Sequence, residues 1–222
     1  MTTAEDLRGF VLSHGAVNNP FLDRFKRGEV TDDEFREFAV QFFAFVKHFP
    51  RILATLLANT PDDDAADELA TILASELGDG NPKRRHEYLY HNFLRSIGID
   101  PRDAAGREWL ESTARYVEGL ADLYGDDDYL IALGASFGLE HMAITMWDHL
   151  IPGIVALKSE RPDFAPMDTL YWTFHRDLEE HHEDSMMRAV EGLEPEAFSS
   201  LADGCGRALD LLEGFWMGLE RC

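Results

Sequence analysis

The stretch from residue 169 to residue 187 carries two imidazoles and a carboxylate at a spacing that suits metal binding. It contains no Pro or Gly, which favours a helix. At about 100° per residue, positions i, i+4 and i+7 share one helical face, so His175, Glu179 and His182 should lie one above another. Such a set suits iron, zinc or manganese. A solvated polar face explains the same pattern, because neighbours such as His181 are polar too.

A lone carboxylate, Glu140, lies within a long and largely apolar stretch. On a helix it shares its face with Phe137 and Trp147. A carboxylate on an apolar face must be paired, protonated or bound to a metal. The alternatives are a buried ion pair with an Arg, or a position at the margin of the face. Gly134 and Gly138 have no side chains and so leave part of the surface of the same helix open. This could serve either the approach of a small molecule or close helix packing.

A third pair of candidate ligands, Glu76 and His86, flanks a tight corner. Between them lie two glycines and a proline, which predict that one helix ends and another begins there. Two ordinary surface groups explain the same pattern, so the pair alone is weak evidence for a metal site. Asp79 and Glu87 are rival carboxylates, although Glu87 points about 100° away from His86 on a helix.

These side chains need a scaffold, and the sequence predicts an all-α bundle. Thr31 and Glu34 have the spacing of a capping box, which predicts a helix start. Pro50 is expected to kink or divide its helix, and Pro152 is expected to weaken the helix that contains it. No stretch has the alternating pattern of a strand. We expect one domain, residues 1–222, with seven or eight helices at about 4–14, 31–58, 60–77, 82–97, 104–123, 128–150, 167–191 and 195–219, and a further turn or two at 21–26.

Aromatic side chains at helical spacing predict a core and candidate walls for a substrate pocket. Phe35, Phe38, Phe42 and Phe45 follow i, i+3, i+7 and i+10 spacing, which places them on one buried face. Most aromatic residues in such a pattern serve only the core. The candidate pocket walls are Phe42, Phe45, Phe137, Trp147, Tyr171 and Trp172.

Composition excludes several classes of function. The chain has 222 residues, 45% hydrophobic, and a net charge of −22, which argues against binding to nucleic acid or to anionic membranes. Cys205 and Cys222 do not form a disulfide framework and fit a reducing cytoplasm. The N-terminus lacks the features of a signal peptide, and no apolar run approaches the ~18 residues of a membrane span. We expect a cytoplasmic protein that acts on a small molecule.

Together the candidate ligands fit a dinuclear site. Six N and O ligands from separate helices suit two iron or manganese ions bridged by carboxylates, whereas Cys ligands for structural zinc or an iron–sulfur cluster are missing. Two divalent ions and three carboxylates leave one positive charge, which hydroxide, reduced oxygen or a substrate carboxylate can balance. The candidate metal ligands are Glu76, His86, Glu140, His175, Glu179 and His182, with Glu140 and His182 as the candidate catalytic residues.

This ordered set of motifs resembles the heme-oxygenase-like diiron oxidases and oxygenases, relatives of thiaminase II (TenA) and pyrroloquinoline-quinone synthase (PqqC). Their pattern is a Glu and a His across a helix corner, a lone Glu on a later helix, and then HxxxDxxH. The chain departs from it in carrying Glu179 where the last motif has Asp. A further carboxylate that some members carry on an early helix has no match, although Gln41 and His48 lie in that region. Nothing matches the catalytic Cys of thiaminase II.

The resemblance implies a heme-oxygenase-like bundle that binds two Fe(II) ions, with Mn(II) as an alternative, and activates O2. The substrate would be a small metabolite, amino-acid-derived, that undergoes N-oxygenation or oxidative C–C cleavage. Relatives are often homodimers. Alternatives are a metal-free enzyme of the TenA or PqqC type, a fatty-acid decarboxylating diiron oxidase, and a non-enzymatic helical interaction protein. A heme oxygenase would need a proximal His, for which His14 is the candidate.

Overall fold

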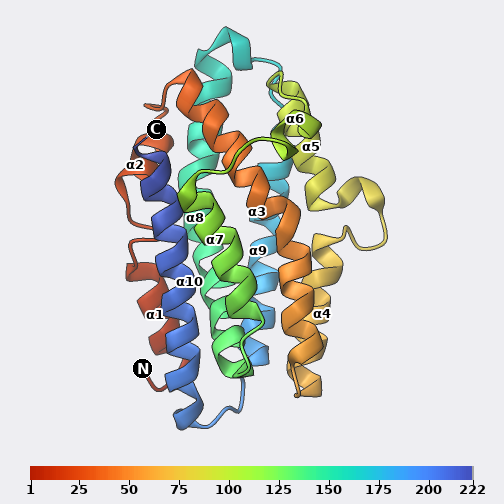
Figure 1. Ribbon diagram of the computed structural model, residues 1–222, viewed down its shortest axis with the longest axis vertical. Helices are drawn as coiled ribbons and strands as arrows, with labels where there is room; N and C mark the ends of the chain where they lie inside the picture. Colours follow the sequence, from red (N-terminus) through yellow and green to blue (C-terminus); the bar gives the residue numbers. More distant parts are fainter. Residues whose placement is uncertain (222) are drawn as a thin grey trace.

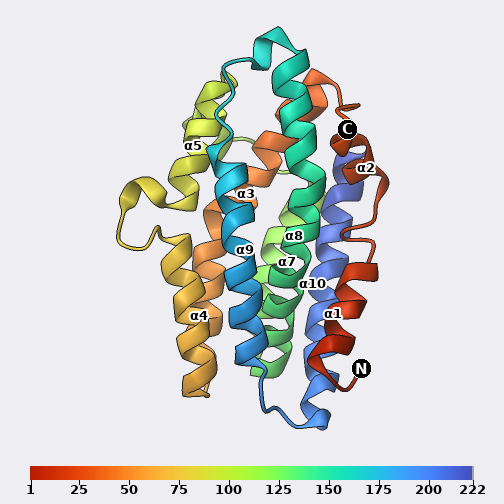
Figure 2. The ribbon, with the colours of Figure 1, turned by 180° about the vertical axis from the view of Figure 1, so that it is seen from behind.

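The chain folds into a bundle of helices. The computed structural model describes residues 1–221, with the side chain of Asp177 excepted, and within them it has ten α-helices, three short 3-10 segments and no strand. The longer helices run side by side along the long axis of the molecule (Figures 1 and 2). The α-helices are α1 (Ala4–Ser13), α2 (Pro20–Lys26), α3 (Asp32–Asn59), α4 (Asp63–Glu76), α5 (His86–Ser96), α6 (Pro101–Ala105), α7 (Glu111–Tyr124), α8 (Tyr129–Glu160), α9 (Leu170–Ala189) and α10 (Phe198–Leu219).

The centre of the bundle is α8. Every residue from Ala132 to Ala143 is buried, as expected of a helix that other helices surround, here chiefly α2, α7, α9 and α10. At Gly134 a Cβ atom would meet the backbone of Leu201 in α10, and at Gly138 one would meet Cys205 of the same helix. The two glycines therefore permit close helix packing and do not open a path for a small molecule.

The start of α3 matches its sequence signal. The Thr31 hydroxyl accepts a hydrogen bond from the Glu34 amide at 3.2 Å, and the Glu34 carboxylate accepts one from the Thr31 amide at 2.6 Å, which together form a capping box. The helix then continues through Pro50 without dividing. This long helix supplies one wall of the site described below.

The expected end of this helix near residue 150 is wrong, because α8 continues through Pro152 to Glu160. Proline removes one helical N–H donor. The packing of α2 against this part of α8 holds the helix together, and it is tight enough that a Cβ atom on Gly153 would meet Phe25.

The number of helices was also predicted wrongly, as seven or eight instead of the ten α-helices in the described residues. The single helix expected at 104–123 is divided into α6 and α7 by an extended connection at residues 108–110. Gln41 of α3 holds this connection, since its Oε1 accepts the Leu110 amide at 3.1 Å and its Nε2 donates to the Glu108 carbonyl at 3.2 Å. A tertiary contact thus competes with local helix propensity.

Two helices, α3 and α8, are long and apolar enough to span a membrane by composition alone. Their most apolar windows are 50% and 78% buried inside the bundle, and core helices of soluble proteins pass the same test. They are weak support for a membrane span.

Cys205 is a buried free thiol, and Cys222 lies outside the described residues.

Candidate metal centre

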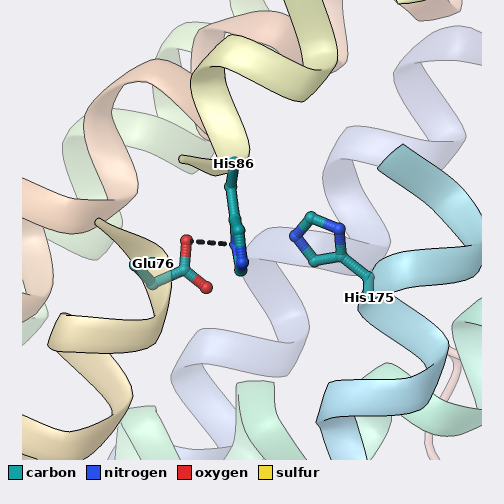
Figure 3. A group of neighbouring side chains, drawn as sticks. All are labelled: Glu76, His86 and His175. Carbon is teal, nitrogen blue, oxygen red and sulfur yellow. Dashed lines mark ion pairs between the residues drawn. The ribbon is translucent and has the colours of Figure 1, made fainter. Parts of the chain in front are cut away.

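Three buried side chains from three helices form what we call the first group: Glu76, His86 and His175 (Figure 3). Glu76 Oε2 lies 2.8 Å from His86 Nδ1, and the ring centroids of His86 and His175 are 4.0 Å apart. One candidate ligand atom of each residue lies within 4.8 Å of the other two. Because metal–nitrogen and metal–oxygen bonds are about 2.0–2.2 Å long, this is close to the separation of ligands that share one ion.

A left-handed turn brings the first group together. Glu76 ends α4 and His86 begins α5, while the residues between them include Gly78, Asp79 and Gly80 at φ of 86°, 51° and 79°. Three successive residues in this conformation reverse the chain within a short distance. The predicted helix corner is present, but α5 begins at His86 and residues 82–84 form a 3-10 segment instead of its first turn.

Three more buried side chains, from two helices, form the second group: Glu140 of α8 with Glu179 and His182 of α9. His182 Nδ1 lies 3.2 Å from Glu140 Oε2 and 3.8 Å from Glu179 Oε2. One candidate ligand atom of each lies within 4.8 Å of the others. The predicted i, i+4, i+7 face of α9 therefore serves both groups, with His175 in the first and Glu179 and His182 in the second.

The two groups adjoin one small cavity. All six side chains are between 1% and 8% exposed, so neither group is a solvated surface face. Residues of both groups line a cavity of about 40 Å³, and five of the six candidate ligands are among them: Glu76, His86, Glu140, His175 and Glu179.

Several polar atoms of these groups lack hydrogen-bond partners although they are buried. Glu76 Oε2 is near His86 Nδ1, yet the pair lacks the alignment of a hydrogen bond, and both ring nitrogens of His86 are unpartnered. Glu179 Oε2 and His182 Nε2 are unpartnered as well. A buried polar atom without a partner costs about 1–3 kcal/mol. Metal ions at the two groups would supply partners, so the residues present fit such ions.

Burial and mutual charge shift the acid–base properties of the second group. Burial raises the pKa of Glu179 to about 8, against the opposing charge of His182. Burial alone would lower the pKa of His182, but its hydrogen bond to Glu140 and the nearby carboxylates raise it to about 9. Without a metal, this group therefore retains protons near neutral pH. Metal binding requires their release.

The first group behaves differently. Burial would raise the pKa of Glu76, but the charge and the close contact of His86, together with the charge of His182, outweigh burial and lower this pKa. Burial, followed by the charge of His86, holds the pKa of His175 well below its usual value. A neutral His175 is ready to bind a metal through nitrogen, because imidazole ligates in its neutral form.

The remaining wall of the cavity is apolar and comes from α3, α8 and α9. Of the predicted pocket walls, Phe45, Trp147 and Tyr171 line it. Sequence reasoning missed other lining residues, although the step of four from Phe45 to Phe49 was a usable signal. The lining residues that were not predicted are Val46, Phe49, Leu139, Met142, Ala143 and Met146.

Three predicted pocket walls lie elsewhere. Phe42 and Trp172 pack against each other, with ring centroids 6.1 Å apart, and Phe42 stacks on Trp216 in the aromatic core. Phe137 stacks on His141 at 3.7 Å. None of the three is among the residues that line the cavity. Helical periodicity identifies buried aromatic side chains but does not say which of them face a cavity.

Rival and additional candidates from the sequence lie away from the groups. Asp79 is half exposed and lies 3.9 Å from Arg84, and Glu87 lies 3.8 Å from His91, so the structure brings Glu76 to His86 instead.

His14, the candidate heme ligand, lies near surface carboxylates. Its Nδ1 accepts a hydrogen bond from the Ala16 amide, and its Nε2 is 3.4 Å from Asp210. Gln41 binds the connection before α7, as described above, and His48 Nδ1 lies 2.8 Å from the Ala44 carbonyl in its own helix. His14, Gln41 and His48 are not among the residues that line the cavity.

Known proteins with similar sequences are synthases of small metabolites. The chain is 27% identical to the 4-chloro-allylglycine synthase of Streptantibioticus cattleyicolor, over 95% of this chain and 79% of that protein. It is 20% identical to the 4-aminobenzoate synthase of Chlamydia muridarum, over 97% of this chain and 89% of that protein.

Solved structures share the fold. A CADD-like protein of unknown function from Nostoc punctiforme has a TM-score of 0.81 at 16% identity, covering 98% of this chain and 95% of that one. A TenA homolog from Pseudomonas syringae has a TM-score of 0.74 at 10% identity, covering 99% and 91%. A Shewanella denitrificans domain described as having a heme oxygenase-like fold has a TM-score of 0.71 at 16% identity, covering 98% and 89%.

A family model that matches most of the chain identifies its family. The model of a family described as iron-containing redox enzymes matches residues 36–213, which include all six candidate ligands. The fold and the relatives agree with that assignment. The chain therefore belongs to the iron-containing redox enzymes and has their heme-oxygenase-like, all-α fold.

Proposed function

We propose that the protein is a non-heme diiron oxidase or oxygenase that uses O2 to oxidise a small metabolite. The observation that carries this proposal is the pair of buried three-residue groups that line one cavity, with unpartnered buried polar atoms in both. A structural role alone would leave those atoms unsatisfied at a considerable cost. Membership of an iron-containing redox family supports iron as the metal.

The composition of the two groups supports two ions of the same kind. Three imidazoles and three carboxylates form a donor set that iron and manganese both accept, and thiolates, which would favour zinc, are absent from it. We propose that Glu76, His86 and His175 hold one ion and that Glu140, Glu179 and His182 hold the other. Glu140 and His182 are the proposed catalytic residues.

The chain's own residues would have three tasks. Bound iron would supply the redox chemistry with O2. The apolar walls from Phe45, Phe49 and Met146 would exclude bulk water from the reaction. His182 and Glu140, 3.2 Å apart, would help to hold one ion close to the cavity. The helices keep these side chains in place before the substrate enters.

The substrate is proposed to be amino-acid-derived, and the reaction to be N-oxygenation or oxidative C–C cleavage. The relatives are named for products that carry both an amino and a carboxyl group, 4-chloro-allylglycine and 4-aminobenzoate. The side chains that line the cavity include no Lys or Arg, so a substrate carboxylate would rely on the metal ions for its counter-charge. The cavity of about 40 Å³ is far smaller than the roughly 300–1,000 Å³ of typical ligand pockets, so the walls must move to admit a substrate.

Anaerobic titration with Fe(II), followed by mixing with O2, tests the proposal. We expect two Fe(II) ions per chain and a transient visible absorbance after mixing. Reconstitution with Mn(II) in parallel separates the two metals, since we expect O2 consumption with Fe(II) only. A chain that binds no Fe(II), or that takes up heme with a Soret band instead, would overturn the assignment and favour the metal-free or heme alternative.

Further expectations from the sequence accompany this proposal. We propose a cytoplasmic protein whose partner is a small molecule, without nucleic acid or membrane, and a homodimer of single-domain chains. The net charge of −22 supports the exclusion of polyanionic partners. Light scattering would measure the number of chains per particle, and a single calorimetric transition would support one domain.

A further inference from the structure

The indole of Trp147 makes one directed contact with the second group. Its Nε1–H donates a hydrogen bond to Glu179 Oε1 at 2.8 Å, and both side chains are buried. Trp147 follows Glu140 on α8 by seven residues, which is about two turns, so the two lie on the same face of that helix. The contact thus joins α8 to α9 at the cavity.

The hydrogen bond makes the two oxygens of Glu179 unequal. Oε1 is occupied by the indole, whereas Oε2 has no hydrogen-bond partner and lies 3.8 Å from His182 Nδ1. A carboxylate can bind a metal through one oxygen or through both. With Oε1 held by Trp147, Oε2 is the oxygen left to bind an ion within the second group.

The same indole also contacts the first group. Its ring centroid lies 5.2 Å from that of His175. The His175 ring is in addition fixed by its Nδ1, which is 2.7 Å from the carbonyl of Tyr171. Trp147 is therefore in contact with one candidate ligand of each group.

We propose that Trp147 is a positioning residue that restricts Glu179 to metal binding through Oε2. This inference rests on the proposed diiron function. It assigns a task to a residue that does not itself bind the metal, since groups that orient ligands set their geometry and affinity.

The inference also gives a reason for the glutamate at position 179. Aspartate is shorter by one methylene, about 1.5 Å. From the same backbone position its carboxylate would not reach both the indole of Trp147 and an ion beside His182. The chain thus pairs a longer carboxylate with a hydrogen-bond donor on the neighbouring helix.

The variant Trp147→Phe removes the N–H donor and keeps a buried aromatic ring. The matched control is Trp172→Phe, because Trp172 is fully buried, lies 5.9 Å from Trp147 and has an unpartnered Nε1. Affinity and stoichiometry are measured by anaerobic equilibrium dialysis with Fe(II), and helicity by circular dichroism.

We expect Trp147→Phe to bind one of the two Fe(II) ions about 10–100-fold more weakly while the other ion is retained within a few-fold. Trp172→Phe should keep both affinities. A loss confined to one ion in a protein of unchanged helicity is not the result of general destabilisation. Unchanged affinity for both ions in Trp147→Phe would overturn the inference, and so would an equal loss in the control.

Glu179→Asp tests the same contact from the other side and remains informative if Trp147→Phe does not fold. We expect it to weaken the same Fe(II) ion, and we expect Trp147→Phe to add little in the Glu179→Asp background, since the hydrogen bond is already lost. Additive losses in the double variant would contradict the inference. A wild-type chain that binds fewer than two Fe(II) ions would instead contradict the proposed function itself.

Discussion

The two groups of candidate ligands differ in how the fold holds them. The first group draws its three side chains from α4, α5 and α9, and a left-handed turn joins two of these helices. The second group draws its side chains from α8 and α9 only, and α8 is the most enclosed helix of the bundle. The first group therefore depends on the conformation of one turn, while the second depends on the packing of long helices.

The groups differ in charge as well. The first has two imidazoles and one carboxylate, and the second has one imidazole and two carboxylates. Before metal binding, the second group holds more protons near neutral pH, because the pKa values of Glu179 and His182 are about 8 and about 9. The two proposed ions would therefore be bound in different charge environments and with different affinities.

The largest expected effect follows from removing a proposed ligand of the second group. His182→Ala or Glu140→Gln should lose one Fe(II) ion and lower Fe(II)-dependent O2 consumption by more than about 100-fold, because the loss of a ligand should exceed the effect of losing an orienting group. An oxygen electrode and metal analysis measure both. His181→Ala is the matched control, since His181 is exposed. Wild-type O2 consumption in His182→Ala would remove that residue from the site.

The dependence of the second group on packing is tested by Gly134→Ala. The new methyl group would collide with the backbone of Leu201 in α10, so we expect the free energy of unfolding to fall by about 3 kcal/mol. Gly214→Ala on α10 is the control, because a Cβ atom there has no neighbouring heavy atom within 4 Å. Urea denaturation gives both values. Equal stability of the two variants would show that α8 and α10 tolerate separation.

The dependence of the first group on its turn is tested by Gly78→Ala. Gly78 has φ of 86°, and a Cβ atom would lie 2.5 Å from the Asn81 carbonyl oxygen and 2.6 Å from the Arg85 amide nitrogen. We expect a loss of about 2 kcal/mol and weaker binding of one Fe(II) ion, since alanine would strain the turn that aligns His86 with Glu76.

Gly80→Ala separates strain from collision at this turn. Gly80 also has a positive φ, of 79°, but a Cβ atom there meets nothing within 4 Å. Its cost should be about 1 kcal/mol, with metal affinity retained. If both variants bound two Fe(II) ions with wild-type affinity, the turn would not control the first group.

The smallest expected effect concerns Cys205, which packs against Gly138 of α8. Burial raises the pKa of this thiol to about 12. Since its folded pKa lies above its unfolded pKa, the associated stability is present below about pH 9 and is lost as pH rises toward 12. In a Cys222→Ser background, a thiol reagent at pH 8 should label the native protein only very slowly, and equally slowly with or without Fe(II). Labelling that slows when Fe(II) is added would mean that the α8–α10 packing tightens with the metal.

The candidate ligands could be predicted from the sequence more readily than the residues that form the walls of the cavity. The spacing of His175, Glu179 and His182 follows from helix geometry alone, which is why their shared face could be predicted. The division of the helix expected at 104–123 could not, because it depends on Gln41, far away in the sequence. The hydrogen bond from Trp147 to Glu179 likewise depends on how two helices are rotated against each other.

The prolines within α3 and α8 have a mechanical consequence. Pro50 leaves the Val46 carbonyl without its helical N–H donor, and Val46 lines the cavity. Pro152 does the same for Asp148, which directly follows the cavity residue Trp147. Both α3 and α8 therefore lack one backbone hydrogen bond next to the cavity, and a helix bends most easily where such a bond is missing. We expect the two helices to flex at these points when a substrate enters, so that the cavity can enlarge while the packed ends of the bundle stay in place.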